Sequence, residues 1–229
     1  QMRLRSSLTK LGDNFTSSAA KYDLRSSFKS FTNDTPHFLL RIECRYHRGK
    51  DFLMNHKIGL FYGSTTCYTE MAGEKIRDTI NALLESDTVI MHNIAFDTLP
   101  MMAHYDYLIL GIPTWDYGEL QEDWEKYWDK LADIDFSAKT VALYGLGDQV
   151  GYPEWFQDAL GYLWRKVRDL GAQTIGTWPN EGYDFDQSQA LTEDQSRFVG
   201  LALDDENQLD VSDVLIDRWC RQIIGEFGL

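Results

Sequence analysis

Cysteine is scarce in this chain of 229 residues, and long hydrophobic runs are absent from it. The three cysteines, Cys44, Cys67 and Cys220, are an odd number, lie far apart and form no C-x-x-C pair. A disulfide framework and a zinc site are therefore not expected, and this cysteine content is typical of a reducing compartment. No apolar run approaches the roughly 20 residues that span a bilayer, so we expect no membrane partner.

Basic residues are scarce after position 54. Residues 1–54 contain ten basic and five acidic side chains, whereas residues 55–229 contain twelve basic and thirty-one acidic ones. The formal charge of −14 therefore combines a segment of +5 with a segment of −19. A surface this negative repels nucleic-acid phosphates and anionic lipids and attracts proteins with basic patches. The charge argues against nucleic acid as a partner and favours a basic protein.

Residues 1–54 carry eleven Ser or Thr and show no sustained helical or strand period, which predicts a poorly ordered extension. Their basic, acid-poor composition is also typical of a transit peptide, which would direct the protein to an organelle. Met54 directly precedes the first patterned segment, so a start codon assigned too far upstream, or residues added by cloning, would give the same composition. Without a transit peptide we expect a cytoplasmic protein whose folded domain spans residues 55–229.

The folded domain alternates strand-like apolar runs with amphipathic helical patterns, which predicts an α/β fold. The expected strands span residues 57–63, 88–94, 105–112 and 140–146, with a last strand split into 174–178 and 198–203. Apolar residues at helical spacing fall within 68–84, 120–131, 155–170 and 214–227. We expect a doubly wound sheet of five parallel strands with roughly five helices on both faces. The long polar loop that interrupts the last strand is unusual in a compact domain and is often functional.

Ligands of such sheets bind beyond the carboxyl ends of the strands, which directs attention to three loops. The loop after the first strand contains four Ser or Thr in six positions and leads directly into a helix; it comprises Ser64, Thr65, Thr66, Cys67, Tyr68 and Thr69. Backbone N–H groups and the helix dipole favour an anion there, and the hydroxyls add donors, so a phosphate monoester fits. Ordinary capping of the helix is the alternative.

Each of the other two loops offers an aromatic side chain outside any helical stripe. The loop after the third strand comprises Pro113, Thr114, Trp115, Asp116, Tyr117 and Gly118, and the loop after the fourth comprises Gly145, Leu146, Gly147, Asp148, Gln149, Val150, Gly151, Tyr152 and Pro153. Trp115 and Tyr152 could hold a planar ring between them, among acidic groups and without a Lys or Arg. In contrast, Trp124, Trp128, Trp155 and Trp164 lie on helical stripes and are expected in the core.

Four segments carry a family resemblance: GLFYGSTTCYTEMA, ILGIPTWDYGELQEDW, YGLGDQVGYPEWFQDALG and FVGLALDDENQ. Through them, residues 57–229 resemble long-chain flavodoxins and are most similar to the flavodoxin B (flavodoxin 2) subgroup of proteobacteria. The resemblance implies a flavodoxin-like fold with non-covalently bound FMN. It also implies a monomeric low-potential one-electron carrier, not an enzyme, that takes electrons from an NADPH-dependent flavodoxin/ferredoxin–NADP reductase. Iron–sulfur or other redox enzymes with basic patches would be the acceptors.

The resemblance also implies a role for each loop. Ser64, Thr65, Thr66, Tyr68 and Thr69 match the family's loop for the FMN phosphate, and Trp115 and Tyr152 match the aromatics on the two faces of the isoalloxazine. Thr114, Asp116, Tyr117 and Gly118 match the loop whose backbone contacts flavin N5, and Gly147, Asp148 and Gln149 match the segment near the pyrimidine edge. The family usually has Gly at the position of Cys67, where the absence of a Cβ eases an unusual backbone angle.

Other classes of protein fit the sequence less well. An FMN-dependent NAD(P)H:quinone oxidoreductase on the same fold is the main alternative, although Trp115 and Tyr152 would cover the ring face that a nicotinamide needs. A response-regulator-like module needs an Asp at the end of its first strand, where this chain has Gly63. A G-x-S-x-G elbow and a P-loop motif are both absent from the sequence.

Overall fold

The structure is a computed structural model that describes residues 57–96 and 98–229. The poorly ordered extension predicted for residues 1–54 lies outside the described residues, so that prediction remains untested. The described part of the chain contains no helix that is both long and apolar enough to cross a membrane.

A parallel sheet forms the centre of the domain, in the strand order β2-β1-β3-β5-β6. These strands are β1 (Ile58–Tyr62), β2 (Val89–Asn93), β3 (Tyr107–Trp115), β5 (Thr140–Leu146) and β6 (Gln173–Ile175). Each neighbouring pair in this order is parallel, and β1, β3 and β5 are rich in buried apolar residues. The predicted doubly wound sheet of five parallel strands is confirmed.

The last strand is interrupted, as predicted. β6 pairs with the first half of β5, whereas β9 (Leu201–Leu203) pairs with its second half, residues 144–146. Both pieces are shorter than the predicted ranges. Gly176 has a φ of 80° just after β6, and Trp178 and Phe198 instead pair with each other in the antiparallel strands β7 (Trp178–Pro179) and β8 (Arg197–Phe198). The return of β9 to β5 brings the chain after residue 203 to the carboxyl edge of the sheet.

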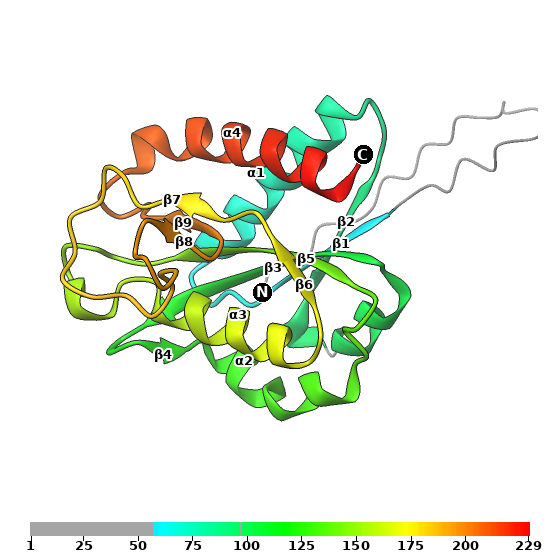
Figure 1. The fold of residues 1–229 in the computed structure, drawn as a ribbon, viewed down its shortest axis with the longest axis horizontal. Helices are drawn as coiled ribbons and strands as arrows, with labels where there is room; N and C mark the ends of the chain where they lie inside the picture. Colours follow the sequence, from blue (N-terminus) through cyan, green and yellow to red (C-terminus); the bar gives the residue numbers. More distant parts are fainter. Residues whose placement is uncertain (1–56, 97) are drawn as a thin grey trace, which may run out of the picture. The chain divides into compact units, whose positions relative to one another are not determined.

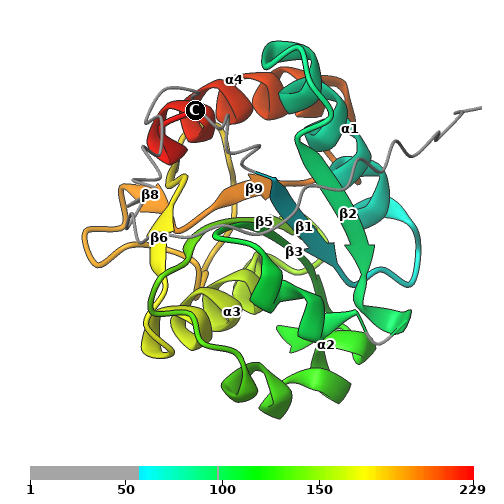
Figure 2. The ribbon, with the colours of Figure 1, turned by 90° about the vertical axis from the view of Figure 1, so that its right-hand side faces the viewer.

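Helices cover both faces of the sheet, α1 and α4 on one and α2 and α3 on the other (Figures 1 and 2). Their bounds are α1 (Tyr68–Leu83), α2 (Glu122–Tyr127), α3 (Asp158–Asp169) and α4 (Leu209–Phe227). The described residues thus contain four α-helices, where roughly five helices were expected. The connection from β2 to β3 consists of two 3-10 segments, η1 (Ile94–Phe96) and η2 (Leu99–His104), and Pro100 lies in the first turn of the second.

Three helix boundaries differ from the apolar patterns. The pattern over 120–131 divides into α2 and a 3-10 segment, η3 (Asp129–Asp133). The pattern over 155–170 begins late as an α-helix, because Gln157 has a φ of 63°, and the residues before it form the 3-10 turn η4 (Pro153–Trp155). α4 begins at Leu209, five residues before the predicted start, because its first turn is largely exposed and so shows no apolar stripe.

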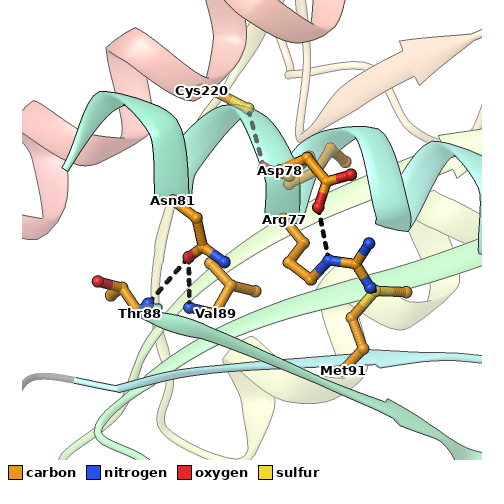
Figure 3. Close-up of polar contacts among 8 residues, drawn as sticks. Arg77, Asp78, Asn81, Thr88, Val89, Met91 and Cys220 are labelled. Atoms are coloured by element: carbon orange, nitrogen blue, oxygen red, sulfur yellow. Dashed lines mark hydrogen bonds and ion pairs between the residues drawn. The ribbon is translucent and has the colours of Figure 1, made fainter. Parts of the chain in front are cut away.

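Side-chain contacts tie α1 to the sheet and to α4 (Figure 3). The Asn81 Oδ1 atom accepts hydrogen bonds from the backbone N–H groups of Thr88 and Val89, both at 2.9 Å, and so fixes the start of β2. The Cys220 thiol on α4 donates a long hydrogen bond of 3.9 Å to the carbonyl oxygen of Ile76. Burial raises the pKa of the Cys220 thiol to about 12, so this cysteine is a core residue with little thiolate character.

Candidate functional site

A cleft of about 270 Å³ opens at the carboxyl edge of the sheet, where β1, β3, β5 and β9 end. Its lining comprises Thr66, Tyr68, Thr69, Pro113, Thr114, Trp115, Asp116, Leu146, Gly147, Asp148, Tyr152, Trp155, Phe156, Asp205 and Glu206. Eleven of the eighteen predicted site residues belong to this lining. Of the other seven, Gly145 lies within β5, and six lie in the same three loops: Ser64, Thr65, Cys67, Tyr117, Gly118 and Gln149. The fold therefore brings the three predicted loops to one place.

The loop before α1 presents unpaired donors. Cys67 occupies the N-cap of α1 with a φ of 70° and makes no capping hydrogen bond with its side chain. Because the N–H groups of a first helical turn have no acceptor within the helix, they remain available to a ligand. The Oγ atom of Ser64 is buried and has no hydrogen-bond partner among the described residues. A buried hydroxyl without a partner is costly, and an anion seated in the loop would satisfy it.

Buried polar side chains hold this loop in place. The Tyr144 hydroxyl, fully buried in β5, donates a hydrogen bond of 2.9 Å to the carbonyl oxygen of Thr69. Burial raises the pKa of Tyr144 well above its ordinary value, so the hydroxyl keeps its proton as a donor. From the other side, the Nε2 atom of Gln121 donates to the Thr65 Oγ1 atom at 3.1 Å, while its Oε1 atom accepts from the first N–H groups of α2. The loop is thus anchored both to the sheet and to α2.

The carboxylate of Glu70, close to the loop, also accepts a hydrogen bond from within the protein. The hydroxyl of Tyr62, at the end of β1, donates a hydrogen bond of 2.6 Å to the Glu70 Oε1 atom in the first turn of α1. Burial, with the neighbouring Glu70 carboxylate, raises the pKa of Tyr62. This hydrogen bond gives the Glu70 carboxylate a partner within the protein.

A sharp turn between β3 and β4 (Glu119–Leu120) carries the second loop. Trp115 pairs with Glu119 across the turn, and both Asp116 and Gly118 have positive φ angles, 40° and 88°. A side chain on Gly118 would also crowd Asp158 and Trp155. The turn therefore needs a glycine at this position. Tyr117, at its tip, is 69% exposed.

Aromatic residues form the walls of the cleft. Trp115 and Tyr152 both line it, as predicted, and Tyr152 is 39% exposed. Tyr117 contacts the ring of Tyr152 edge-on at 6.4 Å between centroids and the ring of Trp155 at 5.1 Å. The prediction that Trp155 lies in the core was wrong, because the left-handed conformation of Gln157 separates it from α3 and leaves it half-buried in the cleft wall.

The other three tryptophans were predicted in the core. Trp124 is fully buried, as predicted, and its indole nitrogen donates a hydrogen bond to the Gly111 carbonyl oxygen at 2.9 Å. Trp128 and Trp164 are half-buried and pack against the outside of the core. These helical stripes therefore extend from the interior to the surface.

The lining of the cleft is acidic. Four carboxylates line the cleft, those of Asp116, Asp148, Asp205 and Glu206, and its lining contains no Lys or Arg. Burial alone would raise the pKa of Asp148, but hydrogen bonds from the Gly151 N–H, the Asn207 amide and the Val150 N–H outweigh it, so the pKa is lowered. Asp148 is therefore ionised at neutral pH.

Asp205 and Glu206 were missing from the predicted site. They follow β9, and pairing of β9 with the second half of β5 places them beside the loop that contains Asp148. The signal for them was present, since the segment DDENQ directly follows a strand-like run and ligands bind where strands end.

The three walls fit one kind of ligand. Neutral donors around the N-terminus of α1 suit a phosphate monoester, and the aromatic side chains of Trp115 and Tyr152 in the lining suit a planar ring. Within the described ranges, no group of three or more His, Cys, Asp or Glu side chains is arranged to hold a metal ion. The arrangement suits a phosphorylated planar cofactor.

Known proteins share this sequence and fold. The family model for flavodoxin matches residues 60–209. Flavodoxin 2 of Escherichia coli (strain K12) is 56% identical over 171 residues, which cover 75% of this chain and 96% of that protein. A flavodoxin of Nostoc sp. (strain PCC 7120) is 47% identical over 176 residues, 77% of this chain and 100% of that protein.

A solved structure agrees with these relatives. The crystal structure of Fusobacterium nucleatum flavodoxin bound to flavin mononucleotide superposes with a TM-score of 0.67 at 32% identity, covering 74% of this chain and 98% of that one. Both the sequence and the fold are therefore shared with flavodoxins over nearly the whole length of the relatives. The chain belongs to the flavodoxin family.

Proposed function

We propose that this chain binds one FMN non-covalently in the cleft and works as a low-potential carrier of single electrons, without catalytic residues of its own. The observation that carries the proposal is that one cleft combines the loop before α1, where the buried Ser64 hydroxyl has no partner, with the aromatic side chains of Trp115 and Tyr152 and four carboxylates. The FMN found in the related Fusobacterium protein supports it.

The loop before α1 would hold the phosphate. Hydroxyls of Ser64, Thr65, Thr66 and Thr69, with backbone N–H groups of the first turn, supply neutral donors, and the helix dipole favours the negative charge. Cys67 adopts a left-handed backbone conformation, which would orient the N–H groups that follow it toward the phosphate. In an L-residue this conformation costs about 1–2 kcal/mol, a strain that a bound anion helps to offset.

The other loops would hold the ring. Trp115 and Tyr152 would cover its two faces, the backbone of residues 116–118 would meet one edge, and Gly147 and Asp148 the other. The side chain of Gln149 is already engaged, because its amide nitrogen donates to Asp204 and its Oε1 atom accepts from the Asp184 N–H. Gln149 would therefore act through its backbone.

Bound FMN would supply the electron chemistry, accepting and giving electrons one at a time. The chain's own residues set how readily this happens. Carboxylates of Asp116, Asp148, Asp205 and Glu206 disfavour further negative charge in the cleft, and the aromatic walls exclude water that would screen them. Both effects lower the potential at which the loaded protein is reduced.

The surface charge would select the partners. Residues 55–229 carry a net charge of −19, which steers proteins with basic patches toward this domain. A flavodoxin/ferredoxin–NADP reductase is the proposed donor, and iron–sulfur enzymes or other low-potential redox enzymes are the proposed acceptors. Electron-transfer complexes usually have small, transient interfaces, so we propose that the carrier is monomeric. We also propose that it is cytoplasmic.

The phosphate loop predicts a preference that binding can test. FMN should bind the apoprotein with one-to-one stoichiometry and about 100-fold more tightly than riboflavin, because only FMN uses the donors before α1. Quenching of tryptophan fluorescence measures both affinities. The Thr66→Ala variant should lose part of the preference. As a control, Ser137→Ala changes an exposed hydroxyl at the amino end of β5, opposite the cleft, and should leave both affinities unchanged. Equal affinities for FMN and riboflavin would contradict the assignment of the loop.

A further inference from the structure

The carboxylate of Asp204 is fully buried, with 0% of the residue exposed, and the two residues that follow it, Asp205 and Glu206, line the cleft. Its Oδ2 atom accepts hydrogen bonds from the Gln149 N–H at 3.1 Å and the Gln149 amide at 2.7 Å, and its Oδ1 atom from the Asn207 N–H at 3.1 Å. The Asn207 amide lies 3.0 Å from both oxygens. None of the salt bridges of the described residues includes Asp204. Only neutral donors therefore hold this charge.

The partners of Asp204 belong to different segments. Gln149 lies in the loop after β5, and its Oε1 atom accepts a hydrogen bond of 2.6 Å from the Asp184 N–H in the long loop that interrupts the last strand. The Asn207 amide also donates to the Asp148 Oδ1 atom at 2.8 Å. Asp204 thus joins its own loop after β9 directly to the loop after β5, and through Gln149 to the long loop.

Two of these loops carry three of the four carboxylates that line the cleft. Asp148 is on the loop after β5, whereas Asp205 and Glu206 are on the loop after β9. The hydroxyl of the buried Ser212 in α4 further holds Asp205 by a hydrogen bond. The two strand ends pair up to Leu146 and Leu203, and the Gly147 N–H donates to the Leu203 carbonyl oxygen at 3.0 Å, all before these carboxylates. Beyond that point, the described hydrogen bonds between the two loops run through Asp204 and Asn207.

We propose that Asp204 is a positioning residue for the cleft, holding the loops after β5 and β9 together so that their carboxylates face the bound flavin. The inference rests on the proposed function, since it assigns to this hydrogen-bond network an effect on FMN. Burying a charge costs free energy unless hydrogen bonds compensate it, and such a cost is consistent with a role in fixing a unique arrangement.

Two variants separate positioning from the simple loss of a charge. Asp204→Asn keeps the shape of the side chain but replaces one acceptor oxygen with an amide donor, which would face the donors of Gln149 or Asn207. The loops after β5 and β9 should therefore move apart. Asn207→Ala removes the link between Asp204 and Asp148 without changing the charge. Asp186→Asn removes an exposed charge from the long loop and is the matched control.

Both network variants should bind FMN about tenfold more weakly than the unchanged protein, by titration of the apoprotein. In both variants, the affinity for reduced FMN relative to oxidised FMN should rise about tenfold, because the carboxylates of the cleft move away from the flavin. That ratio corresponds to a shift of about 30 mV toward less negative midpoint potential for the two-electron couple of oxidised and reduced FMN. Asp186→Asn should show neither effect.

Hydrogen exchange of the apoprotein gives a readout that does not depend on FMN. The amides of Gln149 and Asp184 should exchange about tenfold faster in Asp204→Asn, with urea unfolding as the check that the variant folds. A potential that shifts in Asp204→Asn but not in Asn207→Ala would overturn positioning in favour of a direct charge effect, and unchanged potentials in both would overturn the inference outright. If Asp204→Asn does not fold, Asn207→Ala decides alone. Failure of the unchanged protein to bind FMN would instead contradict the proposed function.

Discussion

Replacing Trp115 with alanine is expected to weaken FMN binding by about 100-fold. The indole forms one wall of the cleft, and stacking of a planar heterocycle on an aromatic side chain contributes about 1–3 kcal/mol. At the upper end of this range the loss corresponds to about two powers of ten in the dissociation constant. Fluorescence titration of the apoprotein measures it, with Tyr152 as the remaining wall.

A second aromatic serves as the control. Tyr162 lies on α3, is 37% exposed and does not line the cleft, so Tyr162→Ala removes a similar side chain without touching the proposed ring site. Its FMN affinity should equal that of the unchanged protein. If Trp115→Ala folds and binds FMN with unchanged affinity, Trp115 does not cover the ring and the site has been assigned wrongly.

Gly111→Ala is expected to destabilise the apoprotein by about 3 kcal/mol. Gly111 lies in the central strand β3, and a Cβ atom there would overlap the Cζ and Oη atoms of the fully buried Tyr144. Tyr144 has little room to move, because its hydroxyl donates to the Thr69 carbonyl oxygen below the phosphate loop. Overpacking of a rigid core typically costs about 1–3 kcal/mol, and displacement of this hydrogen bond adds to it. Urea unfolding measures the loss, and FMN affinity should fall with it.

Gly225→Ala is the matched change of glycine to alanine. Gly225 is in α4, and nothing lies within 4 Å of the Cβ atom that alanine would add. Because alanine is the better helix former, this variant should gain up to about 1 kcal/mol. Opposite signs for the two substitutions are the expected result. A destabilisation of Gly111→Ala no larger than about 0.5 kcal/mol would mean that Tyr144 is not held as the structure shows.

The sequence predicted the sheet and the position of the cleft because both depend on local patterns. Each predicted strand is a short apolar run, and the three loops follow directly from where those runs end. The hydroxyl-rich loop and the aromatics at Trp115 and Tyr152 are visible without any knowledge of long-range contacts. The interrupted last strand was also visible, as two apolar pieces separated by a polar stretch.

The remaining features depend on backbone angles and distant pairing, which periodicity does not report. Trp155 fits the spacing of a core residue, but the positive φ of Gln157 moves it into the cleft wall. Asp205 and Glu206 reach the cleft only because β9 pairs beside the end of β5. The role of Asp204 needs the same pairing, since its partners Gln149 and Asn207 lie on two separate loops.

Stepwise reduction of the FMN-loaded protein tests the central claim most directly. Absorption spectra recorded at controlled potentials, without oxygen, report how many electrons each step takes. Two separated one-electron steps are predicted, the second at a more negative potential than that of free FMN, because four carboxylates line a cleft that has no cation in its lining. A single two-electron step at the potential of free FMN would contradict a one-electron carrier in which this cleft sets the potential.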